Sequence, residues 1–476
     1  MKNNSRIDLI GLFLTALAVR LFYVFFLSKT PFFAPLSGTL DDGVYLKMAQ
    51  SIAAGNWAGT FPLGAYRIPL YPYFLALGRC VFGGGLLWIH LIQSFFGAAS
   101  VALVYLICQK VFECRRTALL AAAACAFYPA FIFFENLLVG ESLSIFLNLS
   151  ALALLLSDLD DRAGSPTASA KARLFFAGLI LGLSVLLRPN TLLAAAFAAA
   201  ALWAIFKTRL KSAARAAVLG LIFFAGLASP IVPSAVKNYL AYRDFVPLSA
   251  VGGVNLYVGN NPEATGIFNL TGVLGTSLDE MINNSARIAE DALGRTLRPS
   301  QISAYWSARA ADFARNSPGS FIKLFAKKTA LFFNRYEFPD ILDILFVAQF
   351  LPVLGAGSLA FGIVAVFGLA GLWTLRGRLV REGKMLLVTA FFGGYALSVV
   401  LFFVTARYRL PAVPFLVMFG AWAVGRRIDA ANKAGPPLKK SDVAVFLAAV
   451  WIVFRPVESV NFATNYNSLA IAMKNK

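Results

Sequence analysis

The chain has 476 residues, of which 59% are hydrophobic and only 14% are charged, whereas a soluble domain carries about 25% charged residues, so an ordinary soluble protein is excluded. The net charge of +20 does not indicate nucleic acid, because Lys and Arg accumulate in cytoplasmic loops of membrane proteins and bind anionic lipid headgroups. One histidine and four cysteines without a CxxC pair leave almost no ligands for zinc or an iron–sulfur cluster, so we expect no metal and no cofactor.

Apolar runs of about 20 residues recur along the chain, and each is long enough to cross a bilayer. The first run follows Lys2 and Arg6 and exceeds the apolar core of a typical signal peptide, so we expect it to be retained. Arg20 lies near its far end, where we expect the side chain to extend toward the membrane surface. The pattern predicts an all-α polytopic membrane protein of about 11 transmembrane helices, near 7–27, 86–109, 117–134, 142–157, 174–206 (counted as two), 216–236, 354–375, 385–405, 410–425 and 443–454.

The apolar run 174–206 is broken by Arg188-Pro189-Asn190 and is compatible with one long helix or with a hairpin of two short spans. The segments before and after it are both basic, with Arg173 on one side and Lys207 on the other. Because basic loops stay cytoplasmic, both ends are expected on the same side. This favours the hairpin and places Arg188 near the outer face.

About half of the 43 basic residues fall in six short segments between the predicted spans. We assign these segments to the cytoplasm, which puts the N-terminus inside and the C-terminal tail outside. This topology divides the chain into three regions: a membrane module at 1–236 with its first outer loop at 28–85, a periplasmic segment at 237–351, and C-terminal spans and tail at 352–476. Residues 322–333, with three lysines among apolar side chains, are expected to form an interfacial helix.

Two adjacent carboxylates, Asp41 and Asp42, follow the first span almost immediately. From Gly43 the sequence reads as a short helix, and negative charge is favoured where a helix begins. One interpretation is that Asp42 only caps this helix. The other is that the pair carries chemistry at the membrane surface.

The predicted outer face collects charged residues from separate spans. A buried carboxylate near a second acid can act as a general base on a hydroxyl group, and the planar guanidinium of arginine binds two phosphate oxygens at once. Such a set suggests group transfer from a lipid phosphate, although any single cation could instead pair with lipid headgroups or backbone carbonyls. The carboxylates are Asp41, Asp42, Glu135 and Glu141, and the cations are Arg67, Arg188, Lys327, Lys328, Arg335, Arg407 and Arg409.

Several motifs on this face support a resemblance to a known family. In chain order they are Asp41-Asp42-x-x-Tyr45, Arg67-Ile68-Pro69-Leu70-Tyr71-Pro72, Tyr128-Pro129 with Gly140-Glu141, Leu187-Arg188-Pro189, Asn255-Leu256-Tyr257-x-Gly259-Asn260-Asn261-Pro262, and Arg407-Tyr408-Arg409-x-Pro411. Together they resemble the GT-C glycosyltransferases that use polyprenyl-phosphate sugars. The bacterial members are related to protein O-mannosyltransferases, to lipid A aminoarabinose transferases and to rhizobial lipopolysaccharide galacturonosyltransferases.

The resemblance implies a GT-C-like helical bundle in the bacterial inner membrane, with periplasmic loops and an active site on the periplasmic side. It implies an inverting transfer from a polyprenyl-phosphate-linked sugar to a hydroxyl of a lipid, glycan or protein acceptor. Asp41 would be the general base, although Asp42 stands where Glu is common, so the choice between the two stays open. Glu141 would position the acceptor or the donor, and the donor would be held by Tyr45, Arg67, Arg188, Lys328, Arg407 and Arg409.

Two other classes of protein have many spans. A transporter or lipid flippase is the first alternative, but transporters place ionisable groups near the bilayer midplane on broken, repeated helices. Here the acids lie at span ends, and Arg188-Pro189 is the one transporter-like feature. A polysaccharide polymerase is the second alternative, and it is not expected to carry an early pair of acids.

Overall fold

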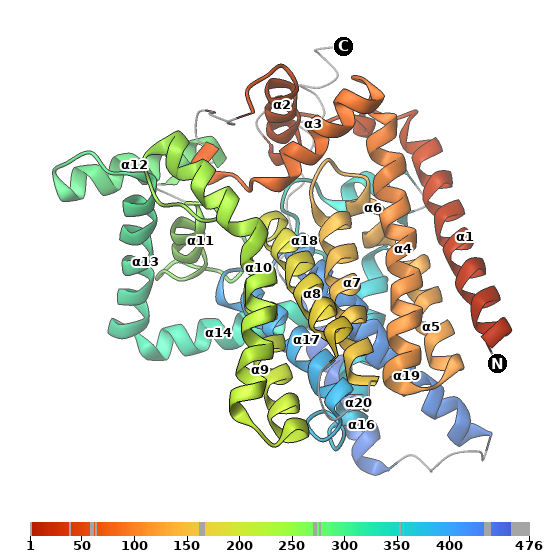
Figure 1. Ribbon diagram of the computed structural model, residues 1–476. Coiled ribbons are helices and arrows are strands. Elements are labelled where there is room, and N and C mark those ends of the chain that lie inside the picture. Colours follow the sequence, from red (N-terminus) through yellow and green to blue (C-terminus); the bar gives the residue numbers. More distant parts are fainter. Residues whose placement is uncertain are drawn as a thin grey trace.

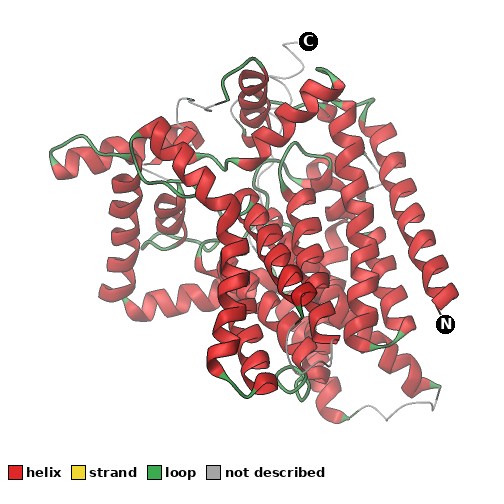
Figure 2. Cartoon of the chain, in the orientation of Figure 1, coloured by secondary structure: helices red, strands yellow, loops and turns green. Residues whose placement is uncertain are grey.

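The computed structural model describes residues 2–37, 40–57, 61, 64–160, 167–269, 274–275, 278–351, 354–355, 357–432 and 439–457. Over these residues the chain is helical, and its one β-type pairing is an isolated bridge between Ile267 and Val404 (Figure 2). The predicted all-α fold class is therefore confirmed.

The elements fall into a bundle and an outer group (Figure 1). The bundle contains α1 (Lys2–Leu27), α4 (Leu87–Phe112), α5 (Arg115–Ala126), α6 (Pro129–Glu135), α7 (Glu141–Asp160), α8 (Ala168–Leu187), α9 (Thr191–Leu210), α10 (Ala213–Tyr242), α16 (Gly357–Leu375), α17 (Gly383–Leu401), α18 (Ala406–Arg409), η5 (Leu410–Ala412), α19 (Val413–Ala431) and α20 (Lys440–Val453). The outer group contains η1 (Pro31–Phe33), α2 (Asp41–Ala53), η2 (Gly64–Tyr66), α3 (Leu70–Phe82), α11 (Gly252–Gly259), α12 (Leu278–Leu293), α13 (Pro299–Asn316), α14 (Pro318–Phe333) and α15 (Ile344–Ala348).

In the described part of the chain, eight helices are long and apolar enough to cross a membrane, and the bent pair α5–α6 would make nine. The protein is thus a multi-pass membrane protein, but the predicted count of eleven is not confirmed. Two predicted spans are not counted: α16 enters only as the shorter apolar helix Ala360–Leu375, and α20 has 14 residues. At 1.5 Å per residue α20 is about 21 Å long, which is less than the roughly 30 Å hydrocarbon core. The third predicted span bends by 51° between α5 and α6, where Pro129 begins a new helix.

The hairpin interpretation of residues 174–206 is confirmed, because α8 ends at Leu187 and α9 begins at Thr191. Arg188 is the C-cap residue of α8 and has an extended backbone. Pro189 explains the break, since a proline disfavours the helical conformation of the residue before it. The turn between the two helices therefore carries Arg188 at a helix end.

α8 and α10 make the most extensive contact of any described helix pair. Glycines allow it: a Cβ atom at Gly178 would lie 2.1 Å from the backbone oxygen of Phe223, and one at Gly226 would lie 2.0 Å from that of Phe175. Small residues let membrane helices approach closely enough for their backbones to touch. This contact fixes α8, and with it the position of Arg188.

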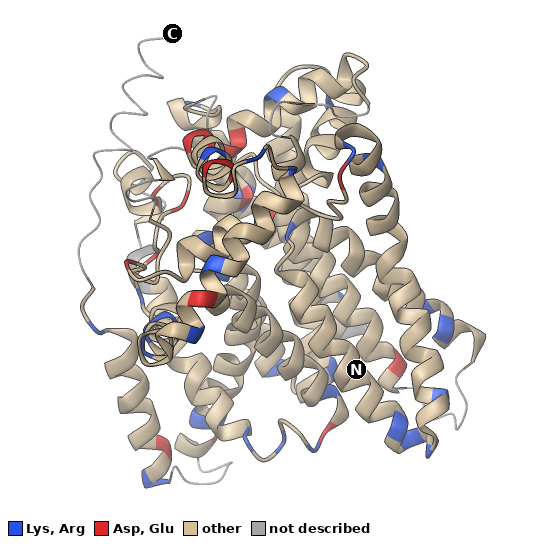
Figure 3. Cartoon of the chain, turned by 90° about the vertical axis from the view of Figure 1, so that its left-hand side faces the viewer, with Lys and Arg blue, Asp and Glu red and all other residues tan. Residues whose placement is uncertain are grey.

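Predicted basic segments meet at one end of the bundle. Asp8 near the start of α1 pairs with Arg115 at the start of α5, at 2.6 Å, and Arg116 pairs with Asp429 at the end of α19. Figure 3 shows Lys and Arg gathered at the lower end of the bundle. The starts of α1 and α5 and the end of α19 therefore lie together, as the assignment of their basic residues to one side of the membrane requires.

The outer group has a hydrophobic core of its own. It is formed mainly by α11, α12 and α13, with Trp306 buried at 2% exposure and packed against Tyr257. Tyr66 from the first outer loop and Phe403 from beyond α17 belong to the same core. The outer group therefore joins the two chain segments on which Arg67 and Arg407 lie.

The glycine contact between α8 and α10 gives a stability prediction. Gly178→Val is expected to destabilise the protein by about 1–3 kcal/mol, because the new side chain meets backbone that has no room to yield. The thermal unfolding midpoint of the detergent-purified protein is the measurement. Gly220→Val on α10, where nothing lies within 4 Å of the added Cβ, is the matched control, and an equal loss in both variants would contradict the close-packing account.

Candidate active site

The two adjacent aspartates open α2, which begins at Asp41, two residues before the expected start at Gly43. The N-cap residue is Leu40, which makes no side-chain cap. The interpretation that Asp42 caps this helix is therefore wrong. The Oδ1 atom of Asp42 accepts a hydrogen bond from the amide of Gly43 at 2.8 Å. Both carboxylates lie in the first turn, where the helix dipole favours negative charge.

Arg407 is the centre of the site. Its Nη1 donates to Asp41 Oδ2 at 2.8 Å and to Asp340 Oδ2 at 3.0 Å, and its Nε donates to Glu141. The three carboxylates come from α2, from the start of α7 and from the segment between α14 and α15. Since Arg407 is only 2% exposed, these charged contacts are shielded from water and correspondingly strong.

Two further arginines complete the set. Arg67 donates to Asp41 Oδ1 at 3.1 Å and to Asp279 Oδ1 at 2.9 Å. Arg188 forms an ion pair with Glu141, and its guanidinium lies 4.9 Å from the ring centre of Tyr408. We call Asp41, Arg67, Glu141, Arg188, Asp340 and Arg407 the arginine–carboxylate cluster.

Local structure holds Arg407 in place. It lies in the single-turn helix α18, which Thr405 caps by accepting a hydrogen bond from the amide of Tyr408. The amide of Ala406 donates to the carbonyl of Phe338 at 2.8 Å. Pro411 follows in η5, where its fixed φ angle suits a helical first turn.

Lys328 lies outside the contacts of the cluster. Its Nζ is bonded to the carbonyls of Gly259 and Phe402, at 3.2 and 3.0 Å, and to Asn260 Oδ1 at 2.8 Å. Two of these acceptors lie at the ends of α11 and α17. Burial lowers the pKa of Lys328 to about 8. The contacts are those of a lysine that ties two helix ends together.

Arg409 also bonds elsewhere. Its guanidinium donates to Glu337 at 2.8 Å and to the carbonyls of Asn334 and Tyr336, both at 2.7 Å. Glu337 in turn accepts from the hydroxyl of Tyr128 at 3.0 Å. These contacts fasten the segment that follows α14, which is the segment that carries Asp340.

Tyr45 is 3% exposed on α2, and its ring packs edge-on against Tyr71 of α3 at 5.6 Å. Burial raises the pKa of Tyr45, and the negative charge of Asp41 adds to the rise. The hydroxyl of Tyr71 donates to Gln93 at 2.7 Å. The two rings therefore pack α2 against α3 beside the two aspartates.

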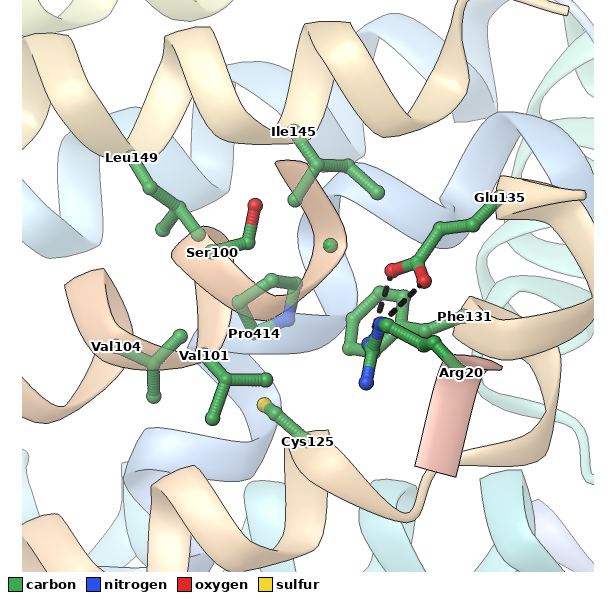
Figure 4. A pocket seen from close by; sticks show the side chains of 11 residues that line it. Arg20, Ser100, Val101, Val104, Cys125, Phe131, Glu135, Ile145, Leu149 and Pro414 are labelled. Atoms are coloured by element: carbon green, nitrogen blue, oxygen red, sulfur yellow. Dashed lines mark hydrogen bonds and ion pairs between the residues drawn. The ribbon is translucent and has the colours of Figure 1, made fainter. Parts of the chain in front are cut away.

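Two expectations about single charged residues are wrong. Arg20 does not extend to the membrane surface: it is fully buried and donates to both carboxylate oxygens of Glu135, at 2.6 and 3.0 Å. Glu135 is correspondingly not grouped with Asp41 and Glu141. Figure 4 shows this ion pair beside a cavity between α1, α4, α6 and α7, lined also by Ser100. A partner inside the bundle satisfies Arg20 better than lipid does.

Sequence reasoning missed Asp340 and Asp279. Both lie in the segment 237–351, which the sequence assigned to the outer side as a whole, without a role for its acids. The chain has only 23 acidic residues, so each acid on the outer side was a possible partner for the predicted arginines. Asp340 also follows Pro339 directly, a sign of a fixed turn.

The surroundings shift the pKa values of the two neighbouring aspartates in opposite directions. Burial acts to raise the pKa of Asp41, but the charges of Arg407, Arg67 and Arg188 outweigh it and leave that pKa below its usual value. Burial raises the pKa of Asp42 to about 6, with a further contribution from the charge of Asp41. Paired carboxylates with separated pKa values are typical of sites with acid–base roles. Asp41 is ionised near neutral pH, and its side chain is 19% exposed, so a hydroxyl group can reach it.

No group of three or more His, Cys, Asp or Glu side chains is placed to hold a metal ion within the ranges given above. The cluster carboxylates face arginines instead, and guanidinium groups are suited to anions. An arginine fork that now holds carboxylates is equally suited to phosphate.

The chain is similar to one protein family and to several solved structures. Residues 66–233 match the family described as dolichyl-phosphate-mannose-protein mannosyltransferase. Among solved structures, the archaeal oligosaccharyltransferase AglB from Archaeoglobus fulgidus, in complex with an inhibitory peptide and a dolichol-phosphate, aligns over 100% of this chain and 56% of its own, with 16% identity and a TM-score of 0.52. The same organism's oligosaccharyltransferase in complex with Zn and sulfate aligns over 98% and 52%, with 16% identity and a TM-score of 0.51.

ArnT from Cupriavidus metallidurans bound to undecaprenyl phosphate aligns over 98% of this chain and 88% of its own, with 15% identity and a TM-score of 0.35. No curated protein sequence matches the chain. The chain spans about half the length of the oligosaccharyltransferases that it resembles. The predicted resemblance to GT-C glycosyltransferases is confirmed by the family match and the shared fold.

The raised pKa of Asp42 gives a prediction on stability. Because the folded protein holds this proton more tightly than the unfolded chain, stability falls as the pH rises from the ordinary pKa of 3.8 to about 6. Asp42→Asn cannot ionise, so its stability relative to wild type is expected to rise by about 2 kcal/mol across this window.

Thermal midpoints of wild type and Asp42→Asn at pH 4 and pH 8 check this. Asp312→Asn removes a carboxylate whose side chain is 54% exposed, and it serves as the control whose difference from wild type stays constant. A difference between Asp42→Asn and wild type that is the same at both pH values would contradict the account.

Proposed function

We propose that this protein is a membrane glycosyltransferase that moves a sugar from a polyprenyl-phosphate donor to a hydroxyl group of a lipid, glycan or protein acceptor. The observation that carries the proposal is the arginine–carboxylate cluster, in which an ionised aspartate lies against arginines suited to phosphate. The family match over residues 66–233 and the shared fold support the same class of reaction. The dolichyl phosphate in the family's description and the dolichol-phosphate in the AglB complex support this donor class.

The transfer is a single inverting displacement. Asp41 accepts the proton of the acceptor hydroxyl, and the hydroxyl oxygen forms a bond to the anomeric carbon of the sugar. The bond between that carbon and the phosphate oxygen breaks, and its electron pair stays with the lipid phosphate. Arg407 and Arg67 stabilise the charge that develops on this leaving group, so no general acid is needed.

The cluster also couples donor binding to the strength of the base. Arg407 and Arg67 hold the pKa of Asp41 low, in spite of its burial. A phosphate that accepts hydrogen bonds from Arg67 as well as from Arg407 draws both guanidinium groups away from Asp41, which raises the pKa of Asp41 toward the operating pH. Asp41 therefore becomes an effective base when the donor phosphate is beside it, and Glu141 holds Arg188 and Arg407 in place for both groups.

The side of the membrane follows from charge. Asp41 follows the end of α1, Glu141 opens α7 and Arg188 ends α8, whereas the ion pairs of the basic segments join the start of α1 to the start of α5. The cluster thus lies at the end of the bundle opposite to those basic segments, which the positive-inside rule assigns to the cytoplasm. We assign the active site to the periplasmic face of a bacterial inner membrane.

The test is a transfer assay with the purified full-length protein in nanodiscs. Radiolabelled polyprenyl-phosphate sugars and a bacterial membrane lipid extract are supplied as donor and acceptor. Asp41→Asn is expected to lower the transfer rate by about 10²–10⁴-fold, which is the range for loss of a general base, while Asp312→Asn on the outer helix α13 keeps the wild-type rate.

A transporter or lipid flippase is the alternative that the same assay addresses. Movement of the labelled lipid across proteoliposome membranes without formation of any glycosylated product would contradict the glycosyltransferase and favour that alternative. Full transfer activity in Asp41→Asn would remove Asp41 from the reaction and leave Asp42 as the candidate base.

A further inference from the structure

Arg407 has to bind the donor phosphate, yet two of its three nitrogen atoms are already engaged. Nη1 is shared between Asp41 and Asp340, at 2.8 and 3.0 Å, and Nε is bonded to Glu141. With only 2% of the residue exposed, there is little room for a further anion beside these partners. A phosphate that binds to Nε or Nη1 must take the position of one of the three carboxylates.

The charges of the cluster lead to the same conclusion. Three arginines face three carboxylates in the cluster, and Arg67 also pairs with Asp279, so the positive charge is balanced before any phosphate enters. A buried anion without a compensating cation is very costly. One carboxylate must therefore move away or take up a proton when the phosphate binds.

The three carboxylates differ in how firmly they are held. Glu141 is fully buried and pairs with both Arg188 and Arg407. Asp41 pairs with both Arg67 and Arg407. Asp340 has a single arginine ion-pair partner among the described residues. Burial raises the pKa of Asp340 against the opposing charge of Arg407, whereas the pKa of Asp41 is lowered, so Asp340 gives up its negative charge more readily than Asp41.

Asp340 can leave without disturbing its segment. The residues around it, 334–343, are not helical, but they are fastened by their backbone. The carbonyl of Phe338 accepts from the amide of Ala406 at 2.8 Å, and Asp343 caps α15 by accepting from the amide of Leu345 at 2.6 Å. A side-chain rotation at residue 340 is thus sufficient to free one position on Arg407 Nη1.

We propose that Asp340 and the donor's phosphate compete for the same position on Arg407 Nη1, so that binding of either one releases the other. This inference rests on the proposed function and adds a residue that tunes how tightly the lipid phosphate is held. The phosphate that remains after transfer carries more negative charge than the donor did and binds the arginines tightly. Return of the Asp340 carboxylate to Arg407 opposes that binding and promotes release of the lipid phosphate.

The experiment measures binding of undecaprenyl phosphate to the purified full-length protein in nanodiscs. Asp340→Asn keeps the shape of the side chain and removes its charge. It is expected to lower the dissociation constant roughly tenfold, since a charge-assisted competitor worth about 1.5 kcal/mol is lost. Asp340→Ala is expected to do the same, and Asp312→Asn, which removes an equal charge from an exposed site, is expected to leave the affinity unchanged.

The outcomes separate this inference from the proposed function. Unchanged or weaker binding in both Asp340 variants, with saturable binding in wild type, overturns the competition and leaves the glycosyltransferase intact. If Asp340→Asn and Asp340→Ala both fail to fold, Asp340 is a structural residue and the competition is likewise overturned. An absence of saturable binding in wild type and in every variant overturns the proposed function and this inference with it.

Discussion

Arg407 joins three carboxylates that lie at three distant points of the sequence, and the rest of the site depends on this single guanidinium. Asp41 enters from α2, Glu141 from the start of α7 and Asp340 from the segment after α14. Buried charges are tolerated only when they are paired, and removing one member leaves the others unpaired at a cost of about 3–5 kcal/mol. The bundle and the outer group must therefore be assembled correctly before the site exists, because no single segment contains it.

The positions of these residues follow from the way helices meet the membrane surface. Asp41 and Glu141 open helices and Arg188 ends one, so their side chains lie where the backbone leaves the apolar layer. Pro189 and Pro411 set the turns that hold Arg188 and Arg407. The outer group carries Arg67 and Phe403 on segments of one packed core and so fixes the distance between the two arginine-bearing loops. Charged groups thus gather at one end of long apolar helices.

Much of the fold could be predicted from the sequence, because apolar run length and charge bias act locally. The hairpin of α8 and α9 followed from Arg188-Pro189 and from the basic residues on both sides. The number of spans did not follow, since a window of apolar residues does not show that α5 and α6 bend at Pro129 or that α20 is short. Arg20 and Glu135 were misplaced for a related reason: their pairing joins residues 115 positions apart, and only the packing of α1 against α4 and α5 reveals it.

The candidate site likewise contains residues that the sequence identified and residues that only the fold identifies. Asp41, Glu141, Arg67, Arg188 and Arg407 were all named from the sequence, because a charge at the end of an apolar run is rare and therefore informative. Lys328 and Arg409 were named by the same criterion, yet their contacts are to helix ends and to Glu337. Asp340 was not named, because nothing local distinguishes an aspartate that meets an arginine of another segment from one that meets water. Pair formation across the chain is a property of the fold.

The central claim is that the arginine–carboxylate cluster holds the phosphate of a lipid-linked sugar while Asp41 faces the reacting hydroxyl. A cryo-EM structure of the protein in nanodiscs with a bound polyprenyl-phosphate sugar tests it most directly. The account predicts phosphate oxygens within hydrogen-bond distance of Arg407, with the anomeric carbon on the side of Asp41. A lipid phosphate bound at a different place, with the pairs among Asp41, Glu141, Asp340 and Arg407 unchanged, would contradict it.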